Sequence, residues 1–215
     1  PHGVSTSVFK PILKGDKEEI ALFDMKRKLY GDNPIDFSLF FNSRNIRRKE
    51  VMSLLLGWKY FQNNLDKSVR NGAKLVLHTN PVDPNGTDLP AVIKMLFPKN
   101  DSNIIWTDEV MSPEGINLLY NATNCVILPS SNEGWGLSLT EALLAGKPII
   151  ATVTGGMQDQ MRFEDQNGDW INFNKDFASN HRGKYTECGI WAFPMFPDYI
   201  SLVGSVPTPY IFEDK

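Results

Sequence analysis

Two glutamates and two glycines lie close together in the segment Glu133–Glu141, between an apolar run and a helical pattern. Gly134 and Gly136 let the backbone take open or left-handed conformations and come close to a ligand. Free N–H groups at the start of the following helix face the same place and form an anion site suited to a phosphate. Carboxylates are poor phosphate ligands but good acceptors for hydroxyl groups. The segment therefore suits a ligand with phosphate between two hydroxyl-bearing groups, as in a nucleotide sugar.

A purely structural interpretation of this segment is equally consistent with the spacing. Glycine-rich turns before helices are common, and a glutamate in the first helical turn is favoured by the helix dipole alone. The choice between the two interpretations depends on whether positive charge is placed nearby.

A basic segment supplies such charge, because four of the six residues from Arg44 to Lys49 are arginine or lysine. The segment follows one apolar run and precedes a long helical pattern. Basic side chains at a strand end are natural partners of a diphosphate. Cations at a helix start oppose the dipole, so a bound anion would offset that cost. A solvated helix start and a nucleic-acid patch are the alternative interpretations.

Apolar runs alternate with helical patterns from residue 36 to residue 152. The expected strands are 36–41, 75–78, 103–106, 125–128 and 149–152, and the expected helices are 51–65, 89–96, 112–120 and 138–145, with a weaker helix at 18–30. This alternation predicts an α/β fold with a Rossmann-like parallel sheet and helices on both faces. Such sheets bind ligands at the carboxyl ends of their strands, where both chemical segments lie.

Three parts of the chain differ in pattern. Residues 1–17 have little periodicity and read as an interdomain linker remnant, and residues 18–160 form the predicted sheet domain. Residues 161–215 are rich in Asp, Asn, Gly, Pro and aromatic residues, so we expect a loop-rich C-terminal extension packed on that domain.

The composition excludes several classes of protein. A net charge of −3 over 215 residues argues against a general nucleic-acid or anionic-membrane binder. Cys125 and Cys188 are too few and too scattered for a disulfide framework, so we expect a reducing, cytoplasmic compartment. No signal peptide or transmembrane run is visible. The histidines and cysteines lack the spacing of a zinc site. His2, in the linker, and His78, at a strand end, are candidates for contact with a ligand cleft, although a structural role is the alternative for His78.

The segment Glu133–Pro148, followed by Ile149–Thr152 and Gly155-Gly156, resembles the family 4 (group 1) glycosyltransferases of GT-B fold. The shared features are two glutamates separated by seven residues, an alanine-containing helix, a Gly-x-Pro, a strand and a Gly-Gly turn. The opening of the chain, through Phe9-x-Pro11, resembles the interdomain linker of that family. The resemblance covers residues 1 to about 160 and implies the C-terminal, donor-binding half of a GT-B fold.

The resemblance implies a role for each matching residue. Catalytic positions would be Glu133, at the hydroxyls of the donor sugar, and Arg44 and Lys49, which would neutralise the diphosphate leaving group. Donor-binding positions would be the backbone amides of Gly134, Trp135, Gly136 and Leu137, then Glu141 at the ribose, and Val110 and Met111 beside the base. The family needs no metal or other cofactor, uses a nucleotide-diphosphate sugar as donor substrate, and retains anomeric configuration. We therefore expect a hexosyltransferase-type enzyme.

The chain departs from the family pattern in one respect. The acceptor site of a GT-B enzyme lies largely in an N-terminal Rossmann-like domain, and neither that domain nor the usual C-terminal crossing helix is evident here. The acceptor (glycan, lipid or protein) is left open, as is attachment to a membrane surface. Alternatives are a nucleotide-sugar epimerase or phosphorylase of the same fold and a non-catalytic nucleotide-sugar-binding module.

Overall fold

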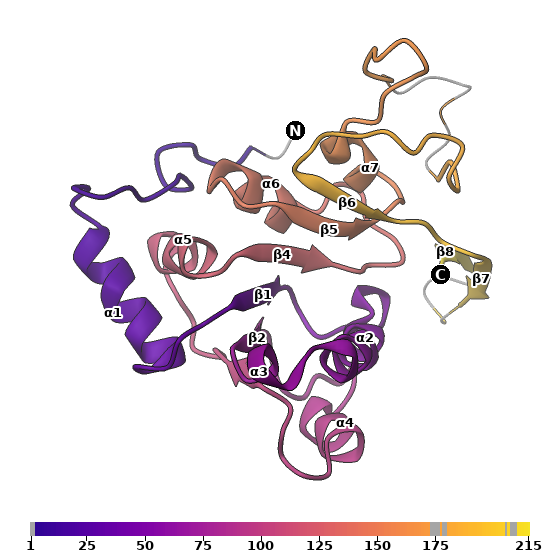
Figure 1. The fold of residues 1–215 in the computed structure, drawn as a ribbon. Coiled ribbons are helices and arrows are strands. Elements are labelled where there is room, and N and C mark those ends of the chain that lie inside the picture. Colours follow the sequence, from indigo (N-terminus) through magenta and orange to yellow (C-terminus); the bar gives the residue numbers. More distant parts are fainter. Residues whose placement is uncertain (1–2, 173–176, 178–179, 205, 207–209) are drawn as a thin grey trace.

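The computed structural model describes residues 3–172, 177, 180–204, 206 and 210–215. It contains a six-stranded parallel sheet of order β3-β2-β1-β4-β5-β6 (Figure 1). The strands are β1 (Phe37–Asn42), β2 (Ala73–His78), β3 (Ile104–Trp106), β4 (Cys125–Leu128), β5 (Ile149–Thr152) and β6 (Ala192–Met195). The helices are α1 (Glu19–Tyr30), α2 (Val51–Asn64), α3 (Lys67–Arg70), α4 (Leu89–Leu96), α5 (Pro113–Ala122), α6 (Leu137–Leu144) and α7 (Met157–Met161). The predicted Rossmann-like α/β fold is confirmed.

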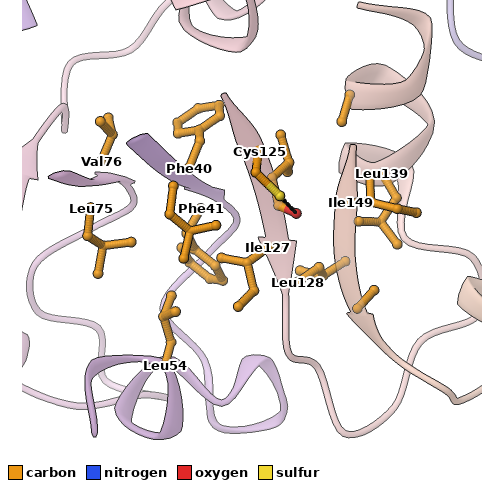
Figure 2. Close-up of a cluster of buried hydrophobic side chains, with 14 of the residues drawn as sticks. Phe40, Phe41, Leu54, Leu75, Val76, Cys125, Ile127, Leu128, Leu139 and Ile149 are labelled. Atoms are coloured by element: carbon orange, nitrogen blue, oxygen red, sulfur yellow. Dashed lines mark hydrogen bonds between the residues drawn. The ribbon is translucent and has the colours of Figure 1, made fainter. Parts of the chain in front are cut away.

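Helices lie on both faces of the sheet. On one side α1 packs against α5, α5 against α6 and α6 against α7, whereas α2 and α4 pack together on the other (Figure 1). Figure 2 shows Leu54 of α2 below the strands, on the side to which Ile127 points, and Leu139 of α6 beside Ile149. The strands are apolar on both faces, as a doubly covered parallel sheet requires.

The core lies at the centre of this sheet. Phe40, Leu75, Val76 and Leu128 are fully buried, and the ring of Phe40 meets the ring of Tyr120 edge-on at 5.2 Å between centroids. Burial of each such side chain contributes roughly 1.5–3 kcal/mol. The core thus fixes the positions of the loops at the strand ends.

The helix boundaries follow local chemistry. Ser112 caps α5, because its side chain accepts a hydrogen bond from the Gly115 amide at 3.2 Å and Pro113 occupies the first helical position. Gly146 follows α6 in a left-handed conformation, which ends that helix, and Pro148 directly precedes β5.

The segment after residue 160 is more regular than the loop-rich extension expected from the sequence. Ala192–Met195 pairs with β5 as the sixth strand of the sheet, in parallel register. This strand contains Pro194, which is tolerated because β6 is an edge strand and one side of its backbone needs no partner. A separate antiparallel pair, β7 (Ile200–Val203) and β8 (Ile211–Asp214), follows it.

In the described part of the chain no helix follows α7, and none of the described residues forms a C-terminal crossing helix. Within the same residues, none of the helices is long and apolar enough to span a bilayer.

Candidate functional site

The strand order places a topological switch point between β1 and β4. From β1 the chain builds outward to β2 and β3, and from β4 it builds outward to β5 and β6 on the opposite side. In open α/β sheets, ligands bind in the crevice outside the carboxyl ends of the strands at such a point. Two loops meet there, the basic loop (residues 43–50) after β1 and the glutamate loop (residues 129–136) after β4. The Ser131 amide donates to the Arg48 carbonyl at 2.9 Å and joins them.

Glu133 lies between two cations of the basic loop. Its Oε1 accepts a hydrogen bond from Arg48 Nη1 at 2.6 Å and another from Lys49 Nζ. The Glu133 side chain is only 8% exposed and that of Lys49 only 11%. Burial lowers the pKa of Lys49, and its hydrogen bond with Glu133 opposes that shift. The two segments selected from the sequence therefore form one partly desolvated charge cluster, in which charge-assisted hydrogen bonds are strong.

Arg44 occupies a different part of the basic loop. Its guanidinium makes two hydrogen bonds to the buried Asp83 carboxylate, Nε–Oδ2 at 2.7 Å and Nη2–Oδ1 at 3.2 Å. These bonds lower the pKa of Asp83. Arg48, rather than Arg44, accompanies Lys49 at Glu133. The sequence marked Arg48 only as one of a basic group, because its partner lies 85 positions away in the chain.

A cavity of about 430 Å³ opens beside the basic loop. It is lined by Arg44, Ile46, Arg47, Arg48, Asn85, Ile211 and Glu213. Arg47 pairs with the fully buried carboxylate of Glu213 at 3.2 Å. The Asp214 amide donates to the Ser131 carbonyl at 3.0 Å, so β8 borders both loops. The Arg47–Glu213 pair could not be predicted from the sequence, because the two residues are 166 positions apart in the chain.

Glycines hold the glutamate loop against its neighbours. Gly136 has φ +82° and begins α6, and it has no side chain with which to cap that helix. Gly155 has φ +49°, and a Cβ there would overlap the carbonyl oxygen of Glu133. The Gly155-Gly156 turn therefore packs directly on the loop that presents Glu133, and only glycine fits this approach without strain.

The Glu141 carboxylate is hydrogen-bonded to the buried side chain of Tyr120. Tyr120 Oη donates to Glu141 Oε2 at 2.7 Å and accepts from Asn42 Nδ2 at 3.0 Å. Burial raises the pKa of Glu141, and the tyrosine hydrogen bond lowers it. Burial also raises the pKa of Tyr120 well above its usual value. The sequence marked Tyr120 only as part of the buried face of a helix; its hydroxyl links the end of β1 to the predicted ribose-binding carboxylate.

The other predicted donor-binding residues lie at the same edge of the sheet, at varied depth. Gly134 is exposed with open space beside it, Trp135 is 43% exposed, and Leu137 is 40% exposed at the start of α6. In the loop after β3, Val110 is fully exposed and Met111 is partly buried. Strands β2 and β1 lie between β3 and β4 in the sheet, so this loop is farther from the glutamate loop. The roles of all five residues stay predictions.

The histidines and cysteines that the structure describes form no cluster. Nδ1 of His78, at the end of β2, lies 3.1 Å from Thr107 Oγ1, and burial lowers the pKa of its ring. His2 falls outside the described residues. Both cysteines are free thiols, and the described residues hold no group of three or more His, Cys, Asp or Glu side chains able to bind a metal. Metal independence stays a prediction.

Comparisons with known proteins agree with this geometry. Residues 96–181 match the family model described as glycosyl transferases group 1. An uncharacterized glycosyltransferase of Methanocaldococcus jannaschii is 22% identical over 178 residues, covering 74% of this chain and 45% of that protein. The crystallised C-terminal domain of a group 1 glycosyl transferase from Francisella tularensis aligns with a TM-score of 0.55 at 21% identity, covering 79% of this chain and 80% of that one.

A third relative is HepE of Anabaena, solved in complex with UDP and glucose. It aligns with a TM-score of 0.53 at 18% identity and covers 73% of this chain and 38% of that one. The chain spans less than half of the length of the curated relatives it matches.

The family match includes β4, the glutamate loop, α6 and the Gly155-Gly156 turn. The sheet order and the all-parallel pairing agree with the fold of the solved C-terminal domain. Residues 96–181 of the chain thus match the group 1 glycosyltransferase model, and the chain has the Rossmann-like α/β fold of a GT-B C-terminal domain.

Proposed function

We propose that this domain binds a nucleotide-diphosphate sugar at the carboxyl ends of β1 and β4 and serves a hexosyl transfer with retention. The observation that carries the proposal is the buried Glu133 carboxylate held by Arg48 and Lys49 beside the uncapped start of α6. Carboxylate, cations and free N–H groups at one switch point match the hydroxyls and phosphates of such a donor.

The diphosphate would lie against the basic loop and the first turn of α6. Arg44, Arg47, Arg48 and Lys49 carry four positive charges, whereas their partners Asp83, Glu133 and Glu213 carry three negative ones. One positive charge remains, and the helix N-terminus adds about half a charge more. A diphosphate is neutralised further when Glu133 turns from the cations toward the sugar. These cations make a bound metal unnecessary for charge compensation.

The two glutamates would hold the two hydroxyl-bearing ends of the donor. Glu133 accepts hydrogen bonds from the sugar and Glu141 from the ribose, with Tyr120 fixing the orientation of Glu141. Gly134, Trp135, Gly136 and Leu137 supply backbone N–H groups between them, and Val110 and Met111 border the base. The complex of HepE with UDP and glucose supports a donor of this class.

In the proposed reaction the bond between the anomeric carbon and the diphosphate oxygen breaks, and its electron pair leaves with the diphosphate. An acceptor hydroxyl oxygen bonds to the same face of the anomeric carbon, and its proton passes to an oxygen of the departing diphosphate. Lys49, Arg44 and the start of α6 stabilise the charge that develops on the leaving group, which is usually the largest catalytic contribution. In this proposal a separate domain binds the acceptor, and transfer depends on that domain.

Calorimetric titration with UDP-glucose, GDP-mannose and ADP-glucose tests donor binding. We expect saturable binding of one donor, weakened about tenfold or more by Glu141→Gln and by Lys49→Met, because each removes a charge-assisted hydrogen bond worth about 1.5–3 kcal/mol. Lys94→Met is the matched control, since Lys94 is exposed on α4. Equal affinities for all three variants, or no binding of any donor, contradict the proposal.

A further inference from the structure

A second large cavity shares Trp135 with the candidate donor site, and the rest of its lining lies outside that site. It has a volume of about 800 Å³, and its lining residues come from α6, α7 and the segments around them. Figure 1 shows where these helices lie beside β5 and β6. Three of the five tryptophans of the chain line it, Trp135, Trp170 and Trp191. Of these, Trp135 is 43% and Trp170 55% exposed. Exposed aromatic surface gathered in one hollow is a feature of binding sites rather than of ordinary protein surface. We call this cavity the tryptophan groove.

The buried residue Gln160 fixes two walls of the tryptophan groove, one through its side-chain amide and one through its backbone carbonyl. Gln160 Oε1 accepts from Thr140 Oγ1 at 2.8 Å, and Thr140 Oγ1 accepts from Trp135 Nε1 at 2.8 Å. Gln160 Nε2 donates to the Trp135 carbonyl at 2.6 Å, and Trp191 Nε1 donates to the Gln160 carbonyl at 3.2 Å. Both indole N–H groups are thus satisfied inside the protein. The rings are held in place in advance, so little entropy is lost when a ligand packs against them.

The third wall and the rim add polar groups. The Arg162 guanidinium stacks over the Trp170 ring at 3.4 Å from its centroid, which leaves the guanidinium edges for hydrogen bonds. Asp159 is exposed on α7, and Lys147 also lines the groove, where its Nζ donates one hydrogen bond to the Asn121 carbonyl at 3.3 Å. The lining therefore combines flat apolar rings with a carboxylate acceptor and two cationic donors.

We propose that the tryptophan groove binds a short saccharide chain, with pyranose rings packed against the indole faces and hydroxyls bonded to Asp159, Arg162 and Lys147. A pyranose has a face of C–H groups and a rim of hydroxyls, which matches aromatic walls with a polar rim. A purely apolar ligand, such as an acyl chain or a helix face, desolvates the Asp159 carboxylate and the edges of the Arg162 guanidinium without offering them hydrogen bonds. This binding does not depend on the proposed donor site and goes beyond it.

Fluorine NMR of the full chain labelled with 5-fluorotryptophan tests this proposal. The label gives five resonances, three from the groove and two from Trp58 and Trp106 elsewhere, assigned by single Trp→Phe variants. Maltotetraose, cellotetraose, mannotetraose and chitotetraose are titrated separately to millimolar concentration. We expect at least one of them to shift the three groove resonances saturably and to leave the other two unchanged.

Two variants locate the contact. Trp170→Ala removes an exposed ring without disturbing the core and weakens saccharide binding about tenfold, and Asp159→Asn weakens it several-fold. Phe193→Ala is the matched control, because Phe193 is also 55% exposed but lies on β6 outside the groove. The proposal is overturned if no saccharide shifts the groove resonances, if Trp58 and Trp106 shift equally, or if Trp170→Ala binds as well as the parent protein.

The same samples separate this proposal from the proposed donor site. Trp170→Ala and Asp159→Asn leave nucleotide-sugar affinity unchanged, whereas Glu141→Gln leaves saccharide affinity unchanged. Loss of donor binding with intact saccharide binding contradicts only the proposed function, and the reverse result contradicts only the groove.

Discussion

Replacing Tyr120 by phenylalanine removes one hydroxyl from the centre of the candidate site. That hydroxyl is fully buried, donates to Glu141 and accepts from Asn42. The bond to the carboxylate is worth about 1.5–3 kcal/mol and the bond from the amide about 0.5–1.5 kcal/mol. Because Asn42 and Glu141 are only partly buried, water can hydrogen-bond to them in the variant and offset part of the lost free energy. We expect a loss of about 2–3 kcal/mol in the free energy of unfolding, or roughly 4–10 °C in Tm.

The pH dependence of this loss has a definite sign. Burial raises the pKa of Glu141 in the folded state, and the Tyr120 hydrogen bond lowers it, so Tyr120→Phe raises that pKa further. A carboxyl with a raised folded pKa costs stability once the pH rises above its unfolded value, 4.5. The destabilisation by Tyr120→Phe is therefore largest near neutral pH and shrinks as the pH falls through the raised folded-state pKa values of the variant and the parent protein, both above 4.5.

Urea unfolding at a series of pH values, with calorimetry of donor binding, measures both effects. The matched control is Tyr60→Phe, because the Tyr60 ring is 62% exposed on α2. We expect the control to match the parent protein and Tyr120→Phe to lower donor affinity as well, since Glu141 loses its orienting partner. A Tyr120→Phe protein as stable as the control, or one with a pH-independent deficit, refutes the reasoning.

Three further predictions follow from the packing. Gly155→Ala forces the glutamate loop away from the Gly155-Gly156 turn and lowers Tm and donor affinity together. The control is Gly168→Ala, which is also at positive φ but has open space around it and costs about 1 kcal/mol by thermal unfolding. Equal effects of the two substitutions contradict the close approach. Glu213→Gln weakens the pair with Arg47, so amide exchange in β8 and the basic loop quickens together; exchange confined to one of them contradicts the contact. Leu54→Ala costs about 2–5 kcal/mol in urea unfolding, and a cost below 1 kcal/mol contradicts its core position.

Most of the fold could be predicted from the sequence, because each element of a doubly wound sheet leaves a local periodic signal. The five strands from Phe37 to Thr152 were predicted within a few residues. The strand at Ala192–Met195 was missed, because its short segment lies in a region of poor periodicity that is rich in Asp, Asn, Gly, Pro and aromatic residues.

The site was predictable where its parts follow strands and unpredictable where its partners are distant. Glu133 and Lys49 meet because parallel strands end at one edge of the sheet. Arg48 carries no local sign that separates it from the neighbouring arginines. The hydroxyl of Tyr120 and the carboxylate of Glu213 act through partners on other elements, so only the folded chain reveals their contacts.

The central claim is that a donor diphosphate lies between the basic loop and the start of α6. A crystal structure of this chain with the nucleotide sugar that it binds in calorimetry tests that claim most directly. We predict phosphate oxygens within hydrogen-bonding distance of Lys49 Nζ and of the first N–H groups of α6, with Glu133 turned to a sugar hydroxyl. A donor bound elsewhere, with Glu133 still paired to Arg48 and Lys49, contradicts the account.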